Sequence, residues 1–371
     1  MKRRPRALAL ASQSRLAMMA LLWLAFFAYA GRPLLAGAAA AGFAPAAGWL
    51  FLLALTVIPA VAMFTHRAQL TGYAILGVFS TLLVLVFLGD VLRGISLLAR
   101  FPFDARAVSL TILYATGALS LIGLVQARWP RVRRVAIPIE NLPQELEGYR
   151  IVQWSDVHIG PTIQRGFVQC LVDRTNALNA DAVAITGDFV DSSLEQSREH
   201  IQPLRDLRTR DGAFYVTGNH EYYWRASEWI PALQEAGLEF LKNEHRVITR
   251  GAAKLVMAGV TDPVGRYTHK QDPDRALAGA PADAVKVLLS HRPQTASAAD
   301  RLGVDLQLSG HTHGGQFFPF NLVIKRFQPI VAGLHRVGRT WLYVNRGTGY
   351  WGPPTRLAVG GEITVVELRR G

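Results

Sequence analysis

Cysteine is almost absent from this sequence, because Cys170 is the only one among 371 residues. An intramolecular disulfide is therefore impossible, nothing marks an oxidising compartment, and a structural zinc site made of several thiolates is excluded. Cys170 lies in the helix-like stretch GFVQCLVDRTNAL. We interpret it as a buried structural thiol and not as a nucleophile.

Acidic residues are scarce in the first third of the chain. Residues 1–134 hold 14 Lys and Arg but only two acids, Asp90 and Asp104, whereas residues 135–371 hold 26 Lys and Arg and 25 acids. Of the net charge of +13, the N-terminal third thus carries +12 and the remainder +1. A basic nucleic-acid-binding face on the C-terminal part has no support in this distribution, and no nucleic-acid partner is expected. No obligate protein partner is evident either.

Long apolar runs fill the acid-poor third, in a chain that is 50% hydrophobic. A spanning helix needs about 20 predominantly apolar residues, so residues 1–134 are predicted to be a membrane anchor. Its four expected spans are residues 16–31, 46–64, 70–89 and 107–127. The first is short, and a cleaved signal peptide ending at AYAG is the alternative. No ionisable residue lies in the middle of a span, which argues against a transporter or a proton relay.

Basic residues flank these spans unevenly. The positive-inside rule then places both termini, and with them the C-terminal domain, in the cytoplasm. The external loops carry Arg32 and, offset by the two acids, Arg93, Arg100 and Arg106. The residues on the predicted cytoplasmic side are Lys2, Arg3, Arg4, Arg6, Arg15, Arg67, Arg128, Arg131, Arg133 and Arg134.

The pattern changes after residues 135–149, a proline-punctuated stretch that follows the basic residues 128–134 and that we interpret as a linker. Over residues 150–371, short β-rich apolar runs alternate with helix-like segments, and each run ends abruptly in a polar, glycine-containing loop. Examples are RIVQWSDVHIG, DAVAITGDFVD, GAFYVTGNHEYY, VKVLLSHRP and VDLQLSGHTHGG. This pattern is typical of a layered α/β domain whose functional residues lie at the strand ends.

Half of the ten histidines lie in these loops, together with carboxylates and an amide. In a strand, residues i and i+2 face the same way, so Asp156 with His158, and His311 with His313, are each able to reach one point. Mixed carboxylate and imidazole ligands suit Mn, Fe, Co, Ni or Zn rather than Ca. The full set, in chain order, is Asp156, His158, Asp188, Asp191, Asn219, His220, Glu221, His291, His311 and His313.

Each motif alone has an ordinary alternative, such as a surface loop, a capped turn or a hydrogen-bonded histidine. Five of them in order, each at the end of an apolar run, indicate one metal site. The ligands are too many for a single ion, and two divalent ions about 3.5–4 Å apart that share a carboxylate would use them all.

These motifs resemble those of the calcineurin-like metallophosphoesterase superfamily: DVH, GDFVD, GNHE, SH and GHTH. The GHTHGGQ extension and the later NRGTG are similar to its membrane-associated bacterial branch, so a bacterial inner membrane is expected. The resemblance covers roughly residues 148–369. It implies a four-layer αββα sandwich, with two mixed sheets packed together and helices outside.

The resemblance also implies a role for each site residue. Asp188 would bridge the two ions, and His220 would face the phosphate as electrophile or general acid. Asp191 is expected to fix its loop through backbone hydrogen bonds, and Glu221 either orients His220 or is an exposed carboxylate at a helix start. One ion would be held by Asp156, His158, Asp188 and His313, and the other by Asp188, Asn219, His291 and His311.

The expected activity is hydrolysis of a phosphomonoester or phosphodiester by a hydroxide that bridges the two ions. Two aromatic clusters, EYYWRASEW and QFFPF, flank the site motifs. They are interpreted either as core packing or as an apolar rim that admits a lipid-like or nucleotide-lipid phosphoester. Two other functions remain open: a non-catalytic membrane sensor or scaffold with a metal-binding domain, and a nuclease.

Overall fold

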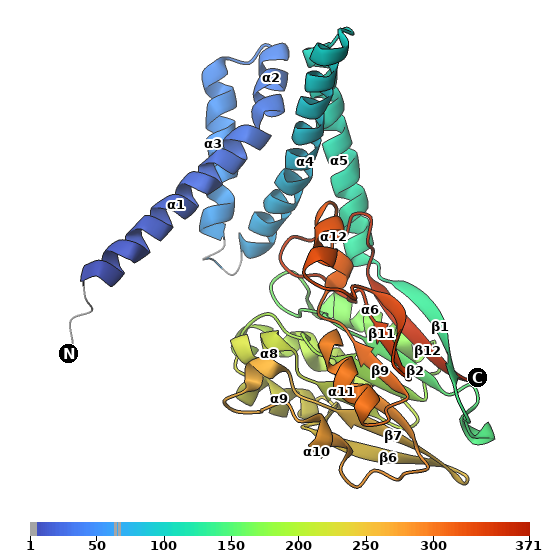
Figure 1. The fold of residues 1–371 in the computed structure, drawn as a ribbon. Helices are drawn as coiled ribbons and strands as arrows, with labels where there is room; N and C mark the ends of the chain where they lie inside the picture. The colour runs from blue at the N-terminus through green and yellow to red at the C-terminus, as the bar shows by residue number, and fades with distance from the viewer. Residues whose placement is uncertain (1–5, 63–64, 66–67) are drawn as a thin grey trace. The chain divides into compact units, whose positions relative to one another are not determined.

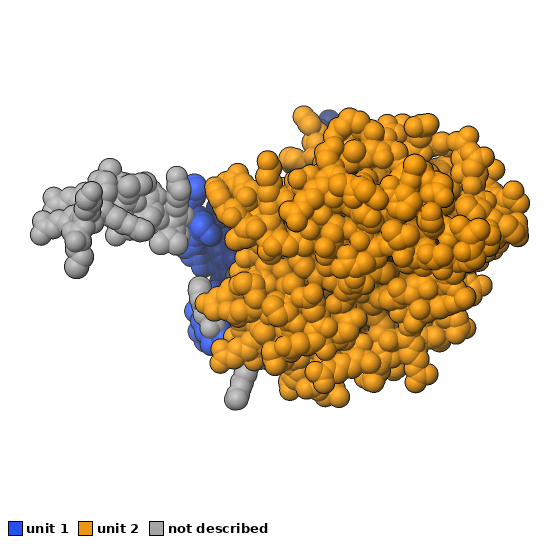
Figure 2. Space-filling model, turned by 90° about the horizontal axis from the view of Figure 1, so that it is seen from below, with its two compact units in different colours: residues 1–122 blue, residues 123–371 orange. Residues whose placement is uncertain are grey.

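A computed structural model describes residues 6–62, 65 and 68–371 of the chain, which divides into two compact units, residues 1–122 and 123–371 (Figure 2). Several residues named above lie outside the described part. They are Lys2, Arg3, Arg4 and Arg67, and also residues 63–64 at the end of the expected second span.

The first unit is helical (Figure 1). Three helices are long and apolar enough to cross a membrane, and a bent pair formed by Met18–Ala30 and Arg32–Ala39 makes up to four. A small core, which includes Phe27, Leu52, Phe79 and Leu82, packs these helices together. The helices are α1 Arg6–Ala30, α2 Arg32–Ala40, α3 Pro45–Ala62, α4 Gln69–Ala99 and α5 Ala105–Arg128, whose last turns belong to the second unit.

Helix α4 continues ten residues past the expected end of the third span at residue 89. The extension is apolar apart from Asp90, Arg93 and Ser96, and it adds Leu92, Ile95 and Leu98. Asp90 accepts hydrogen bonds from Tyr29 and Arg32, each at 2.6 Å. The helix therefore carries an acidic residue whose charge is paired.

The second unit contains two mixed six-stranded sheets, ordered β1-β12-β2-β3-β4-β5 and β10-β11-β9-β8-β7-β6. In the first sheet β2 to β5 run parallel, and in the second β7, β8, β9 and β11 do. The strands are β1 Arg131–Ile139, β2 Arg150–Trp154, β3 Ala182–Thr186, β4 Ala213–Val216, β5 Glu239–Phe240, β6 Glu244–Arg250, β7 Ala253–Gly259, β8 Val285–Leu289, β9 Leu306–Ser309, β10 Gly333–Val337, β11 Thr340–Val344 and β12 Glu362–Arg370.

Alternation along the strands builds the layers. On β2, Ile151 enters the core between the two sheets, whereas Val152 and Trp154 face the helices outside. Helices α6 and α9 cover the first sheet, and α10 and α11 contribute Ala276 and Ala299 to the layer outside the second. The predicted αββα sandwich is thus the observed fold.

The remaining helices of the second unit are short. The α-helices are α6 Arg165–Asn176, α7 Leu194–Ser197, α8 Asn219–Tyr223, α9 Ala226–Glu235, α10 Pro273–Leu277, α11 Ala296–Arg301 and α12 Phe320–Val323. The 3-10 helices are η2 Gln144–Leu146, η3 Arg198–Asp206, η4 Pro263–Gly265, η5 Pro293–Thr295, η6 His313–Gly315 and η7 Ile324–Arg326. Cys170, on α6, is half-buried and free, so it is less enclosed than the sequence suggested.

The stretch expected as a linker, residues 135–149, is largely built into this fold. Strand β1 pairs in parallel with β12 at the edge of the first sheet, and its side chains alternate, with Ile137 and Ile139 buried. Pro138 is tolerated because an edge strand leaves one side of its backbone unpaired. This alternation of buried and exposed positions indicates a strand. The prolines of the stretch led to its interpretation as a linker.

Candidate metal centre

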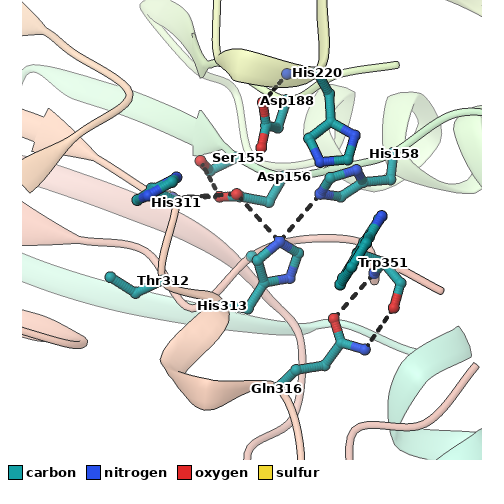
Figure 3. Close-up of polar contacts among 12 residues, drawn as sticks. Ser155, Asp156, His158, Asp188, His220, His311, Thr312, His313, Gln316 and Trp351 are labelled. Atoms are coloured by element: carbon teal, nitrogen blue, oxygen red, sulfur yellow. Dashed lines mark hydrogen bonds and ion pairs between the residues drawn. The ribbon is translucent and has the colours of Figure 1, made fainter. Parts of the chain in front are cut away.

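The candidate site residues lie where neighbouring strands of the two sheets end. The chain leaves β2 at Asp156 and His158, β3 at Asp188, β8 at His291, and β9 at His311 and His313, and α8 begins with Asn219 directly after β4. The carboxyl ends of adjacent parallel strands meet at one edge of a sheet. The fold therefore delivers all the expected ligands to one place, most of which Figure 3 shows together.

Sharp turns, and not strand geometry, orient five of these residues. Their φ angles are positive: 52° at Asp156, 58° at His158, 49° at Asp188, 72° at His311 and 52° at His313. A side chain in this left-handed region costs about 1 kcal/mol or more, and such residues cluster at functional sites. The argument that residues i and i+2 of a strand share a face does not apply here, because these residues lie beyond their strands. It was right that Asp156 and His158 come together and wrong that His311 and His313 reach one point.

Three groups of ligand atoms result, and the atoms of each lie within 4.8 Å of one another. They are Asp156, His158 and His313; Asp188, His291 and His311; and His158, Asp191 and His220. In the first, His313 Nε2 lies 3.0 Å from His158 Nε2 and 3.3 Å from Asp156 Oδ1 (Figure 3). In the second, His291 Nε2 lies 3.2 Å from Asp188 Oδ2 and 3.1 Å from His311 Nδ1. His311 and His313 thus belong to different groups.

Burial makes most of these imidazoles suitable as ligands. It lowers the pKa of His158 to about 4 and that of His311 to about 3, so both are neutral at neutral pH. The pKa of His313 falls well below its usual value for the same reason. A neutral imidazole offers a nitrogen lone pair to a cation, which an imidazolium does not.

His291 differs from the other three histidines. Burial lowers its pKa, but the Asp188 carboxylate at 3.2 Å outweighs that effect and raises it to about 10. In the protein alone a proton on His291 therefore balances the buried Asp188 charge. A divalent cation between the two side chains would replace that proton.

Two buried polar atoms support the same interpretation. Asn219 Oδ1 and His158 Nδ1 are enclosed without a hydrogen-bond partner in the described part of the chain. An unpaired buried acceptor costs about 1–3 kcal/mol. Asn219 was expected to offer its amide oxygen to a metal ion, and its unpaired oxygen fits that role.

His220 lies beside the first group. Its ring centroid is 4.6 Å from that of His158, and its Nδ1 lies 2.8 Å from Asp191 Oδ1. Burial lowers the pKa of His220, but the hydrogen bond to Asp191 and the charge of Asp188 outweigh it and raise the pKa above its usual value. The backbone N–H of His220 also donates to Asp188 Oδ1 at 2.8 Å.

Asp191 and Glu221 differ in part from what the sequence predicted: Asp191, and not Glu221, contacts the His220 ring, and Glu221 lies at a helix start, as one alternative had it, but is buried. The Asp191 carboxylate contacts the His220 ring and accepts a hydrogen bond from Trp224 Nε1 at 3.0 Å. Glu221 is fully buried and accepts from four backbone N–H groups, at 2.6–3.3 Å. Their donors are Asp188, Phe189, Val190 and Gly218.

The position of Glu221 in the chain explains why it bonds to backbone N–H groups and not to His220. It is the third residue of helix α8, where a carboxylate satisfies backbone N–H groups that have no partner in the helix. From there it joins the loop after β3 to the loop after β4. Burial and the nearby charge of Asp188 raise its pKa. Glu221 is thus the link between two ligand-bearing loops.

Two glycines allow these loops to approach the carboxylates. A Cβ atom on Gly218 would overlap Asp188, and one on Gly310 would overlap Ser155 and Asp156. Any side chain at these positions would displace a candidate ligand. Gly218 directly precedes Asn219 in the chain, and Gly310 directly precedes His311.

Arg356 is a site residue that sequence reasoning missed. Its guanidinium is fully buried, and it donates to the carbonyl oxygens of Gly349 and Arg346, each at 2.6 Å, and lies 3.2 Å from His313 Nδ1. It joins the NRGTG segment to the loop of His313. The only signal was that segment itself, in which Gly347 has a φ of 89° and no room for a side chain beside Arg356.

Comparisons with known proteins agree with this architecture. The family model described as calcineurin-like phosphoesterase matches residues 149–315. A transmembrane protein with metallophosphoesterase domain from Danio rerio is 36% identical over 366 residues, covering 91% of this chain and 84% of that protein. An uncharacterised metallophosphoesterase from Campylobacter jejuni is 32% identical over 293 residues, covering 77% of this chain and 75% of the relative.

The fold and its carboxylate–imidazole groups define a metallophosphoesterase-type domain, preceded by helices able to span a membrane. This chain belongs to the calcineurin-like phosphoesterase family.

Replacing the buried Glu221 by glutamine should loosen the site. One backbone N–H would then face an amide NH₂, and a charged acceptor would be lost, so we expect the free energy of unfolding to fall by about 2 kcal/mol. Thermal unfolding of the full chain in detergent measures this. Glu228→Gln, on the exposed side of α9, is the matched control. Equal melting temperatures for the two variants would contradict the role given to Glu221.

Proposed function

We propose that this protein is a membrane-anchored phosphoesterase that uses two divalent metal ions. The observation that carries the proposal is the pairing at the strand ends: two groups that share no residue each combine one carboxylate with two imidazoles, Asp156 with His158 and His313, and Asp188 with His291 and His311. The family supports phosphoester chemistry as the class of reaction. The complete ligand set favours an enzyme over a sensor or scaffold.

In this proposal one ion is held by Asp156, His158, Asp188 and His313, and the other by Asp188, Asn219, His291 and His311. Asp188 serves both, which agrees with its contact to His291 and with its placement next to the His220 backbone. The neutral amide of Asn219 limits the negative charge around a site that must accept a phosphate anion. Mn, Fe, Zn, Co and Ni all suit such mixed ligands. When bound, the ions supply a nucleophile at neutral pH and offset the charge that develops on the phosphate oxygens.

His220 is the proposed general acid. Its Nδ1 is engaged with Asp191, which leaves Nε2 to protonate the oxygen of the departing group. The raised pKa keeps a larger share of the imidazole protonated near neutral pH. Asp191 holds the ring in one orientation and stabilises its positive charge, while Trp224 donates a hydrogen bond to the same Asp191 oxygen.

Aromatic side chains beside His220 favour a substrate with an apolar part. The rings of Tyr223 and Trp351 lie 5.3 Å and 6.0 Å from the His220 ring, and both residues are more than half exposed. Gln316 fixes Trp351 by a reciprocal pair of hydrogen bonds to its backbone, at 2.8 and 3.0 Å (Figure 3). We therefore propose a lipid-like or nucleotide-lipid phosphoester as substrate.

The charge distribution of the sequence adds a location to this proposal. Both termini and the second unit lie in the cytoplasm, and the membrane is a bacterial inner membrane. A green fluorescent protein fused to the C-terminus should then fluoresce, and alkaline phosphatase fused there should stay inactive. The opposite pattern would reverse the orientation.

Removal of the shared carboxylate should abolish activity. We expect Asp188→Ala to lower Mn-dependent hydrolysis of bis-p-nitrophenyl phosphate by on the order of 10³-fold, because both ions lose a ligand. Asp173→Ala, an exposed acid on α6, is the control and should leave the rate unchanged. Absence of Mn-dependent turnover by the unmodified protein would refute the proposed enzyme.

The role of His220 predicts dependence on the leaving group. His220→Gln should slow hydrolysis of an alkyl phosphodiester by about 10²-fold or more, since an alkoxide must be protonated as it leaves. The effect on bis-p-nitrophenyl phosphate should be smaller, because p-nitrophenolate leaves without a proton. Metal content should be unchanged. Equal effects on both substrates would remove His220 from this role.

A further inference from the structure

We propose that residues 318–327 form a membrane-docking segment, which lies in the headgroup region of the bilayer and holds the candidate metal centre at that surface. This segment comprises the end of the QFFPF motif, helix α12 and η7. The proposed contact of this segment with the bilayer does not require that the protein is an enzyme. The consequence for substrate access rests on the function proposed above.

The docking segment is apolar and exposed. Neither α12 nor η7 contains a buried residue, so these side chains contribute little to the core of the second unit. Leu322 is 64% and Phe327 70% exposed. The exposed apolar side chains of the segment are Phe318, Phe320, Leu322, Val323 and Phe327. Contiguous exposed apolar residues of this kind mark a surface that another apolar phase covers.

The docking segment is joined to the end of the last candidate span. The final turns of α5 belong to the second unit, where Ala127 is buried in the core and the carbonyl of Gly123 accepts from Arg356 N at 3.0 Å. A Cβ on Gly123 would contact Thr355 and Leu357. Phe318 N in turn donates to the Leu357 carbonyl at 3.2 Å. The segment is therefore linked through Leu357 to the C-terminal end of α5, the last candidate span.

The residues around that point suit a bilayer surface. Leu124 and Val125 on α5 are exposed, and Trp129, directly after the helix, is 65% exposed. Tryptophan is enriched at the membrane–water interface. A bilayer that surrounds the end of α5 thus extends over the neighbouring docking segment.

The charge of the docking segment also supports a lipid bilayer as the partner of this surface. Lys325 and Arg326 are exposed between the apolar side chains of the segment and form no ion pair within the part of the chain that the structure describes. Amphipathic elements with apolar and cationic side chains bind anionic lipid surfaces, and each cation near the surface adds to the attraction. A protein partner would not by itself explain the adjacency to the span.

The docking segment also adjoins the metal centre. Asn321 of α12 packs so closely on Gly315 that a Cβ there would overlap its backbone. Gly315 ends η6, which starts at His313, and the next residue, Gln316, holds Trp351 beside His220. A phosphoester embedded in the bilayer would reach His220 past the exposed rings of Trp351 and Tyr223.

Site-specific fluorescence tests the contact without any assay of activity. The full chain carries Cys170→Ser and Leu322→Cys, the latter labelled with nitrobenzoxadiazole, in proteoliposomes of phosphatidylcholine and phosphatidylglycerol. We expect blue-shifted emission and quenching by doxyl-labelled lipid that is several-fold stronger than for a label at Val247→Cys. Val247 is the matched control, an exposed apolar residue on β6, at the other end of the second sheet from β10. Equal emission and quenching at the two positions would overturn the proposal.

A kinetic comparison tests the consequence for substrate access. The double variant Leu322→Ser, Phe327→Ser should hydrolyse hexadecyl p-nitrophenyl phosphate in vesicles about tenfold more slowly, because two apolar anchors are lost. Its hydrolysis of soluble bis-p-nitrophenyl phosphate should be unchanged. Equal rates for variant and unmodified protein on the vesicle substrate would refute the access role. Inactivity of the unmodified protein on both substrates would instead refute the proposed enzyme and leave the fluorescence result valid.

Discussion

Two buried carboxylates impose the main constraint on the second unit. Asp156 and Asp188 are almost wholly enclosed, and a carboxylate in such surroundings needs opposite charge and hydrogen-bond donors. Asp156 accepts from Ser155 Oγ at 2.6 Å and from the His311 backbone, and Asp188 accepts from the His220 backbone and contacts His291. The strands end where these donors converge on the two carboxylates. Gly218 beside Asp188 and Gly310 beside Asp156 leave room for the backbone to approach them closely.

The balance of these charges differs with and without metal ions. In the protein alone, a proton on His291 compensates Asp188, while His158, His311 and His313 stay neutral. Divalent ions would replace that proton and use the unpaired Asn219 oxygen. Glu221 and Arg356 do not bind the ions in this account. They hold the loops of Asp188 and His313, so the ligands are in place before the ions arrive.

Much of this arrangement could be predicted from the sequence, because it is local. Each ligand lies in a short polar loop after an apolar run, and the strand order of an α/β sheet brings such loops together. Counting ligands indicates two ions, the family resemblance implies that His311 and His313 serve different ones, and the structure places the two histidines in different groups. The apolar spans are equally local, and three to four of the expected four have matching helices.

Other features depend on partners that are far apart in the chain. His158 and His313 are separated by 155 residues, and Arg356 reaches His313 across 43. Nothing near Asp191 in the sequence reveals that it faces the His220 ring, and nothing near Glu221 reveals its contacts in the loop after β3. Strand β1 was missed because its partner, β12, lies at the opposite end of the domain. The left-handed turns at the ligands were missed because most non-glycine residues avoid that conformation.

The central claim is that one loop after β9 supplies a ligand to each of two metal ions. Anomalous scattering from crystals of the Mn-loaded protein, combined with metal analysis of the same sample, tests it most directly. The account predicts two ions for each chain, with His313 bound to the ion that Asp156 holds and His311 bound to the other. A single ion, or both histidines on the same ion, would contradict it.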